Sequence, residues 1–388
     1  MAEDWQAGGF GLYLHWPYCE AKCPYCDFNS HVARQIDQGA WCNAYLAEID
    51  RYAQLLPGRV LNSVFFGGGT PSLMDPDSVH QIIARIRQSW PTANDLEITL
   101  EANPSSVEAG RFRAYQQAGV SRISMGIQAL NEPDLKRLGR IHTVDEAKQA
   151  FQIARSTFDR VSFDLIYARQ DQTLDSWKSE LKSAVNMTVD HLSLYQLTIE
   201  PGTAFGDRFE NGRLKGLPKD SLSADMYDAT QEICDAAGMS AYEVSNHAQS
   251  GSESRHNLIY WRYGDYIGIG PGAHGRITLN GVRHATVTYA MPDRWLKAAM
   301  IGATEKEFTP LSAIEQAGEY LLMGLRVSEG IDYKRYSLLL GKEPDRDVLE
   351  HLVTIGMIEP DLSKIRATRN GRLVLNSVIE ELLPDPGV

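Results

Sequence analysis

The sequence predicts an α/β protein: a partial (βα)6 barrel of the TIM type, followed by a smaller helical C-terminal domain with a winged-helix-like plan. Strand-like and helix-like segments alternate six times over about 200 residues, which implies a parallel sheet. Six such units in that length favour a barrel over an open doubly wound sheet, and the glycine fingerprint of dinucleotide-binding domains is missing. From about residue 309 the alternation gives way to helical patterns.

The predicted strands are short segments rich in β-branched and aromatic residues, bounded by turn residues. They span residues 11–16, 60–66, 96–101, 120–127, 160–167 and 191–199. The helices between them carry apolar residues at three- and four-residue spacing, as in segment 41–56. Gly119 is expected to end the third helix in a left-handed conformation, and Thr143 and Glu146 form a capping box that opens the fourth.

The C-terminal part is predicted to be mainly helical. Helices are expected at residues 311–325, 333–340, 346–355 and 371–381, with a small hairpin made by 358–359 and 364–368. The chain therefore divides into a barrel over residues 1–245, a connecting segment over 246–300 and a C-terminal domain over 301–388. Because that last domain is not basic, we expect it to cover the barrel mouth or to form a partner surface rather than to bind DNA.

Composition excludes several classes of protein. The chain has 388 residues, of which 43% are hydrophobic and 23% charged, as in soluble globular proteins. A net charge of −12 argues against a nucleic-acid surface. The acidic start and the lack of any run of 18 apolar residues predict a cytoplasmic protein without a membrane segment. Five cysteines are an odd number for a disulfide framework, and Cys42 and Cys234 lie in helical patterns where burial explains them.

The other three cysteines, Cys19, Cys23 and Cys26, lie within eight positions in a loop after the first predicted strand. Thiolates at this spacing can converge on one inorganic centre. One alternative is a [4Fe–4S] cluster held by three thiolates, which leaves one iron free to bind a small molecule. The other is a zinc ion with His15 or His31 as its fourth ligand. The spacing favours the cluster and leaves both alternatives open.

Polar residues also lie on or directly after the other predicted strands, toward the ends where βα barrels carry their working face. They are the turn Gly67-Gly68-Gly69-Thr70-Pro71, Glu101, Gln128, Asp164, Tyr195 and Glu200. The glycine turn is either a tight βα loop or a backbone surface for a zwitterionic amino-acid group. Glu101 and Asp164 are expected to meet ribose hydroxyls or an ammonium, because buried carboxylates need partners. Arg140 either binds a carboxylate or is an exposed helix-end arginine.

These motifs resemble the radical S-adenosylmethionine (SAM) superfamily. The resemblance is carried by Cys19-x3-Cys23-x2-Cys26 and the glycine turn, and Y-L-H-W-P-Y-C with C-P-Y-C-D-F-N-S is similar to the branch around oxygen-independent coproporphyrinogen III oxidase. It implies a radical SAM barrel in which the three cysteines bind a [4Fe–4S] cluster whose fourth iron takes the amino and carboxylate groups of SAM. It also implies SAM contacts at Tyr13, Tyr25, Gly68, Gly69, Thr70, Glu101, Gln128, Arg140 and Asp164.

Within that branch the sequence is more similar to the HemW group of heme chaperones. The oxidase has a further cysteine where this chain has Phe28, and it has a longer segment before the cluster. H-N-x-x-Y-W at residues 256–261 matches the heme motif of the HemW group. The resemblance therefore implies heme contacts at His256, Asn257, Tyr260 and Trp261. One departure is segment 168–173, which stands where a turn containing Gly-Leu-Pro is expected and changes the loop after the fifth strand.

The plain alternative for His256 is a buried structural histidine, and His247 and His274 are weaker candidates for a heme ligand. With the resemblance, His256→Ala is expected to weaken heme binding and to leave the cluster intact. Serine in place of any of the three clustered cysteines is expected to remove the brown colour of the cluster.

The resemblance implies a heme chaperone that delivers heme to client hemoproteins. Its cofactors would be heme, SAM and a [4Fe–4S] cluster, with no assigned catalytic residue, and SAM and cluster either react or serve as structural or regulatory ligands. The alternative is oxygen-independent coproporphyrinogen III oxidase activity. The clients can include membrane-associated proteins, and the electron donor is unknown. The protein is expected to be a monomer or homodimer that binds no nucleic acid.

Overall fold

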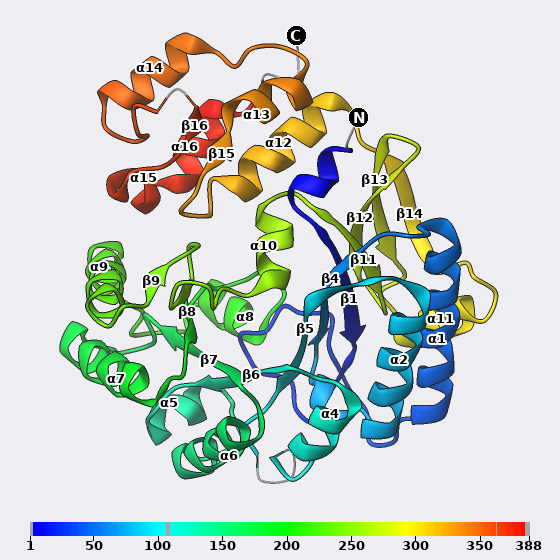
Figure 1. Cartoon of the computed structure of the whole chain (residues 1–388). Helices are drawn as coiled ribbons and strands as arrows, with labels where there is room; N and C mark the ends of the chain where they lie inside the picture. Colours follow the sequence, from blue (N-terminus) through cyan, green and yellow to red (C-terminus); the bar gives the residue numbers. More distant parts are fainter. Residues whose placement is uncertain (1–2, 106–108, 362, 385–388) are drawn as a thin grey trace.

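The structure is a computed structural model that describes residues 3–105, 109–361 and 363–384 (Figure 1). Six parallel strands form its centre, side by side in chain order. They are β1 (Phe10–Trp16), β4 (Leu61–Gly68), β5 (Thr92–Ala102), β6 (Arg122–Gln128), β7 (Arg160–Tyr167) and β8 (His191–Gln196). Each strand pairs in parallel with the next, so the predicted partial barrel of six βα units is confirmed.

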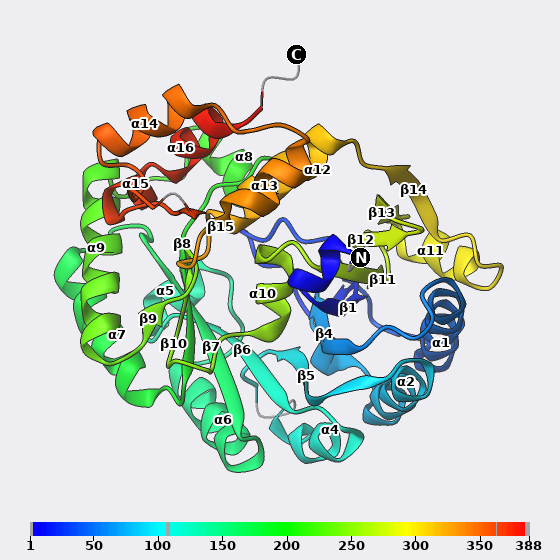
Figure 2. The same ribbon diagram turned by 45° about the horizontal axis from the view of Figure 1, so that its top comes forward.

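Helices follow the strands and surround the curved sheet (Figure 2). They are α1 (Gln38–Leu55), α2 (Pro76–Ser89), α4 (Phe112–Ala118), α5 (Glu132–Arg137), α6 (Val144–Thr157), α7 (Leu174–Met187), α8 (Ala204–Glu210) and α9 (Asp220–Ala236). Gly119 ends α4 with a φ of 109°, and Thr143 opens α6 with the predicted capping box. Both helix boundaries inferred from the sequence are therefore confirmed.

Alternate residues of each strand face the helices and the barrel interior. Leu12 and Leu14 of β1 belong to the main hydrophobic core beneath the helices. Tyr13 and His15 point the other way, and the Tyr13 ring stacks on Phe65 of β4 with ring centroids 6.3 Å apart. The interior of the barrel is therefore lined by polar and aromatic side chains.

The sheet continues beyond the six predicted strands. Next to β1 come β11 (Asp265–Ile269), β12 (His274–Leu279), β13 (Val282–Thr288) and β14 (Glu305–Pro310), and next to β8 come β10 (Asn246–Ala248) and β9 (Ser240–Ala241). Strand β11 pairs in parallel with β1, whereas β12, β13 and β14 each pair in antiparallel fashion with the strand before them. Segment 246–300, expected to be a connector, therefore supplies strands to the barrel sheet, together with α10 (Arg255–Trp261) and α11 (Pro292–Ala299). The three-part division of the chain stays a prediction.

The C-terminal part has a hydrophobic core of its own, which includes Leu321, Tyr336 and Ile379. Its elements are α12 (Ala313–Gly324), β15 (Ile331–Asp332), α13 (Tyr333–Leu340), α14 (Arg346–Thr354), β16 (Lys364–Ile365), α15 (Arg369–Leu373) and α16 (Leu375–Leu382). Two expectations need correction. The expected helix 371–381 is two helices that meet at Val374. The expected hairpin between 358–359 and 364–368 is reduced to one bridge, between Ile358 and Ala367, because β16 pairs with β15 instead.

The C-terminal domain lies at the amino ends of the parallel strands, at the top of Figure 1, whereas β1 runs away from it. Arg335 of α13 pairs with Asp4, which precedes β1, at 2.7 Å. Arg262, just after α10, pairs with Glu329 at 2.7 Å. The expectation that this domain covers the barrel mouth is therefore wrong, because the mouth is at the carboxyl ends of the strands.

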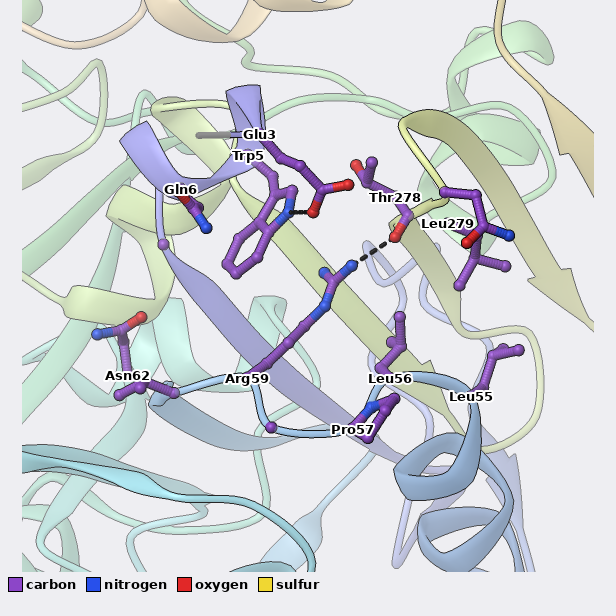
Figure 3. Close-up of a pocket in the computed structure, with 14 residues that line it drawn as sticks. Glu3, Trp5, Gln6, Leu55, Leu56, Pro57, Arg59, Asn62, Thr278 and Leu279 are labelled. Atoms are coloured by element: carbon purple, nitrogen blue, oxygen red, sulfur yellow. Dashed lines mark hydrogen bonds between the residues drawn. The ribbon is translucent and has the colours of Figure 1, made fainter. Parts of the chain in front are cut away.

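An open pocket of about 650 Å³ lies at the same amino-end face, beside the short 3-10 helix η1 (Asp4–Ala7) (Figure 3). Arg59 crosses it and donates hydrogen bonds to the Asp265 carboxylate, at 2.7 Å, and to the Thr278 carbonyl. Its guanidinium lies 4.3 Å from the centre of the Trp5 ring. The charge of Arg59 is thus used to attach the N-terminal segment to the sheet.

Candidate functional site

A second pocket, of about 400 Å³, opens at the carboxyl ends of the parallel strands, where the sequence predicted the working face. Cys19, Cys23 and Cys26 all line it. It is also lined by eight of the predicted SAM contacts, Tyr25, Gly68, Gly69, Thr70, Glu101, Gln128, Arg140 and Asp164. The structure therefore brings together residues that are spread over more than 140 positions of the chain.

The cysteine loop is attached to the glycine turn by backbone hydrogen bonds. The loop begins and ends in the short strands β2 (Tyr18–Cys19) and β3 (His31–Val32), which pair in parallel. Gly69 N donates to Trp16 O at 2.7 Å, and Thr70 N donates to Tyr18 O at 2.8 Å. A Cβ atom on Gly69 would lie 2.6 Å from Tyr18 O, so only glycine permits this approach.

Two of the sulfur atoms accept hydrogen bonds from the pocket wall. Thr70 Oγ1 donates to Cys19 Sγ at 3.5 Å, and Arg140 Nη1 donates to Cys23 Sγ at 3.3 Å. Burial raises the pKa of the Cys19 and Cys26 thiols, so a metal centre would have to displace their protons. Three thiols, two of them with donors directed at sulfur, fit a cluster held by three thiolates, which would leave one iron free to bind a small molecule.

The alternative zinc site is not formed in this arrangement. His15 uses both ring nitrogens, with Tyr13 Oη 3.0 Å from Nδ1 and the Asn29 carbonyl oxygen 2.9 Å from Nε2. His31 Nε2 lies 3.1 Å from Asn29 Oδ1. Within the described ranges, no three His, Cys, Asp or Glu side chains gather around a point that could hold one metal ion. Both histidines serve to hold the cysteine loop.

Glu101 and Asp164 face the pocket from neighbouring parts of the barrel wall. Burial, and then the nearby Asp164, raise the pKa of Glu101 to about 8, and burial raises the pKa of Asp164 to about 6. Gly68 N donates to Glu101 Oε2 at 3.2 Å, which offsets part of this effect. A ligand that brings an ammonium and hydroxyl groups would stabilise both carboxylates.

Glu101→Gln is expected to make the cluster-loaded, SAM-free protein more stable at alkaline pH. Because the folded-state pKa of about 8 lies above the ordinary value of 4.5, Glu101 contributes stability that is full at acid pH and lost as the pH rises through 8. Glutamine cannot ionise. Urea unfolding between about pH 6 and about pH 8 should therefore show a smaller decline than in the wild type. The exposed Glu210→Gln is the control, and an unchanged decline in Glu101→Gln would contradict the assignment.

Arg140 is a half-buried part of the site and not an exposed helix-end residue. Besides Cys23, its guanidinium donates from Nη2 to Asn103 Oδ1 at 2.6 Å and to Gly126 O at 2.8 Å. Asn103 Nδ2 in turn donates to Thr70 Oγ1 at 3.1 Å. This network joins the cysteine loop to the ends of three strands.

Gln128 stands at the end of β6 with a φ of 73°, a left-handed conformation that is uncommon outside glycine. Its side-chain Oε1 is buried and has no hydrogen-bond partner among the described residues. An acceptor in this state fits a ligand that donates a hydrogen bond. The strained backbone and the orphan acceptor both support a binding role for Gln128.

Two groups of residues differ from the sequence expectation. Tyr13 does not line the pocket, because its hydroxyl is bonded to His15 beneath it. The pocket is also lined by residues not predicted as SAM contacts, among them Asn103, Ser124, Gly126 and Leu197, and by Tyr195 and Glu200, which were predicted at this face. Strand alternation could have found Ser124 and Gly126, because they lie two and four residues after Arg122 on the inward face of β6.

The loop after β7, which departs from the family pattern, is held by Arg169. This arginine is buried and forms ion pairs with Glu180 and with Asp134, the latter at 2.9 Å. Ala168 and Asp171 both have a φ of 58°, so the loop turns sharply without glycine. A local ion-pair network therefore fixes this loop.

The heme motif lies elsewhere, on α10 at the amino-end side of the barrel. His256 is only 1% exposed, its Nδ1 lies 2.7 Å from Ser63 Oγ, and its Nε2 lies 2.7 Å from Tyr260 Oη. The ring stacks on Phe65 at 5.1 Å. Burial lowers the pKa of His256 to about 3. In this conformation the imidazole is a satisfied core histidine and offers no free nitrogen to iron.

Tyr260 and Trp261 of the motif line a separate pocket of about 240 Å³, against Met323 of α12. Arg276 and Glu319 close it with an ion pair of 2.6 Å. The weaker histidine candidates are also divided by the fold, since His247 is buried in β10 and His274 is exposed at the start of β12. The structure thus does not bring the heme motif to the cysteine pocket.

Comparison with known proteins agrees with this architecture. A model of the radical SAM superfamily matches residues 13–184, and a model of the HemN C-terminal domain matches residues 311–374. The heme chaperone HemW of Escherichia coli (strain K12) is 37% identical over 378 residues, which cover 96% of this chain and 98% of that protein. The chain belongs to the HemW family of radical SAM proteins. The mitochondrial radical S-adenosyl methionine domain-containing protein 1 of Mus musculus is also 37% identical, over 96% of this chain and 87% of its own.

A solved structure, the coproporphyrinogen III oxidase HemN from Escherichia coli, shares the fold of this HemW-family chain. Its TM-score is 0.81 at 21% identity, over 97% of this chain and 92% of that one. At this identity the likeness shows the fold alone. Radical SAM membership implies a [4Fe–4S] cluster and SAM, and the cysteines, the glycine turn and the pocket carboxylates fit both.

Proposed function

We propose that this protein is a heme chaperone that carries a SAM-liganded [4Fe–4S] cluster and delivers heme to client hemoproteins. The similarity to proteins named heme chaperone HemW, over nearly the full length of both chains, carries this proposal. Phe28, two residues after Cys26, supports it: the side chain is 58% exposed at the rim of the pocket, where the oxidase branch has a further cysteine. The alternative, oxygen-independent coproporphyrinogen III oxidase activity, shares the same barrel and pocket.

The residues of the pocket have separable roles in this proposal. Cys19, Cys23 and Cys26 would hold the cluster, which supplies one-electron reduction of SAM when both are bound. Thr70 and Arg140 would orient two of the sulfur atoms through their hydrogen bonds to Cys19 and Cys23. Glu101 and Asp164 would meet the ammonium and the ribose hydroxyls of SAM.

Heme contact at the motif requires a change in the arrangement described here. The pocket beside Tyr260 and Trp261, about 240 Å³, is smaller than the roughly 300–1,000 Å³ of typical ligand pockets. Helix α12 closes it through the Arg276–Glu319 pair. We infer that a porphyrin reaches Tyr260 and Trp261 only when α12 separates from α10, and that His256 supports α10 from behind.

The partners and compartment belong to the same proposal. Heme-accepting proteins would be the clients, an electron donor would serve any SAM cleavage, and the chain would act in the cytoplasm as a monomer or homodimer without nucleic acid. None of the helices in the described part of the chain has the length and apolar character that a membrane span requires. Membrane-associated clients would therefore be met through a protein surface.

The experiment is a hemin titration of anaerobically reconstituted protein, followed by transfer to an apo-hemoprotein. We expect a saturable Soret band, heme transfer, and no protoporphyrinogen from coproporphyrinogen III with SAM and reductant. A variant with serine at all three clustered cysteines shows whether heme binding needs the cluster. Sustained decarboxylation of coproporphyrinogen would instead support the oxidase.

A further inference from the structure

Arg122, at the start of β6, is a buried cation that pairs directly with no carboxylate in the part of the chain that the structure describes. Its side chain points into the barrel and is 2% exposed. Among the described residues it donates one side-chain hydrogen bond, from Nη2 to Ser162 Oγ at 2.7 Å, and its Nε is buried without a partner. A guanidinium is always charged, so leaving it unpaired in the interior has a cost that needs a reason.

A hydrogen-bond chain connects this guanidinium to the floor of the SAM pocket. Ser162 Oγ, which accepts from Arg122, donates to Ser124 Oγ at 3.0 Å. Ser124 lines the pocket, two residues further along β6. Arg122 therefore lies one hydrogen-bonded serine beneath the pocket, on the side away from the cysteine loop.

The neighbouring Arg160 shows what an ordinary structural arginine does in this barrel. Its Cα is paired with that of Arg122 across β6 and β7. Arg160 forms direct ion pairs with Asp190 at 2.7 Å and with Glu97 at 3.3 Å. These pairs neutralise Arg160 locally. The charge of Arg122 has no such local partner and acts on the groups around it.

Those groups include the two pocket carboxylates. Arg122 lowers the pKa of both Glu101 and Asp164, opposing the larger effect of burial that raises them to about 8 and about 6. On its other side, Arg122 adds to the effect of burial, which lowers the pKa of the His191 imidazolium, and opposes the effect of burial, which raises the pKa of the Tyr242 phenol. The titratable and charged groups that face the carboxylates are Tyr13, Arg122, Arg140, Tyr195 and Tyr260.

We propose that Arg122 is a positioning residue for SAM: its charge favours the ionised forms of Glu101 and Asp164, and its hydrogen bond to Ser162 holds Ser124 at the pocket floor. The proposal rests on the SAM site that radical SAM membership implies and not on heme delivery. It explains why a cation is buried beneath two carboxylates and yet contacts neither. The charge of Arg122 affects the ionisation of the two carboxylates. Its hydrogen bond to Ser162 affects only the position of Ser124.

The test is SAM binding by calorimetry from about pH 6 to about pH 9, with full-length, cluster-loaded Arg122→Gln and Arg122→Lys. For Arg122→Gln we expect at least about tenfold weaker binding near neutral pH, and an upward shift of about one unit in the pH at which affinity is half-maximal. Arg122→Lys keeps the charge, so its pH midpoint should stay close to that of the wild type. Iron content and heme binding should be unchanged in both, which separates this proposal from heme delivery.

Arg160→Gln is the matched control, because it also removes an arginine of the barrel wall, one that is partly buried. It should lower stability, through the loss of two ion pairs, without moving the pH midpoint for SAM. If Arg122→Gln does not fold, Arg122→Lys and Ser162→Ala still decide the matter, since both keep the charge and neither should move the midpoint. Wild-type affinity and midpoint in Arg122→Gln, or a shifted midpoint in Arg122→Lys, would overturn the proposal.

Discussion

Replacing Asn29 with aspartate is expected to remove most of the iron that the protein binds. The Asn29 side chain holds the cysteine loop to the sheet extension: Nδ2 donates to Pro271 O at 2.9 Å and to Ala290 O at 2.8 Å, and Oδ1 lies 3.1 Å from His31 Nε2. Aspartate keeps the shape but has no donor, so it would face two carbonyl oxygens with a negative charge. The free-energy cost of this repulsion should release the cysteine loop, which carries Cys26 and ends in β3, from the sheet extension.

The measurement is iron and sulfide content after anaerobic reconstitution, together with the visible absorption of the cluster. Cys19→Ser provides the reference for complete loss, and Asn186→Asp makes the same chemical change at an exposed position. We expect Asn29→Asp to resemble Cys19→Ser and Asn186→Asp to resemble the wild type. Full iron content in Asn29→Asp would show that the cysteines hold the loop without this tether.

Replacing His256 with alanine is expected to destabilise the whole barrel, in place of the selective loss of heme binding that the motif suggested. The change removes a buried ring that stacks on Phe65 and leaves the Ser63 and Tyr260 hydroxyls without their partner. A cavity together with two orphaned hydroxyl groups costs roughly 2–5 kcal/mol. Weaker heme binding would then follow from the displacement of α10, with the cluster site also affected.

Denaturant unfolding of three variants distinguishes these outcomes. Tyr260→Phe removes only the hydroxyl that meets His256 and should cost about 1 kcal/mol. His274→Ala, at an exposed position, should stay within about 0.5 kcal/mol of the wild type. If His256→Ala unfolds like the wild type and loses only the Soret band, His256 is an iron ligand after all and α10 must leave the barrel to present it.

The meeting of the site residues at one end of the barrel could be predicted, because it follows from local strand patterns and from the parallel arrangement of the strands. Strand-like segments were recognisable from β-branched and aromatic residues, and parallel strands place their carboxyl ends at one edge. Residues after different strands, such as Cys19, Glu101 and Asp164, therefore had to meet. The HemW family followed from motifs of a few residues, such as the cysteine loop and residues 256–261.

The extension of the sheet was missed although a local signal for part of it was present. Asn280 and Gly281 have φ values of 51° and 79°, and they join β12 to β13 as a two-residue turn of the kind that favours hairpins. This Asn-Gly pair lies within segment 246–300, for which the sequence predicts a connector. The parallel pairing of β11 with β1 had no local signal, because it joins residues about 250 positions apart.

By itself, the sequence determined the candidate site residues and the end of the barrel at which most of them lie, since spacing and strand alternation are properties of short segments. Only the tertiary structure decided what surrounds each side chain. It put His256 inside the barrel with both nitrogens bonded, kept Tyr13 out of the pocket and placed the C-terminal domain at the amino ends of the strands. It also left Arg122 without an ion-pair partner among the described residues. The physical reason is that burial and electrostatic environment depend on contacts between distant segments, and those contacts exist only after folding.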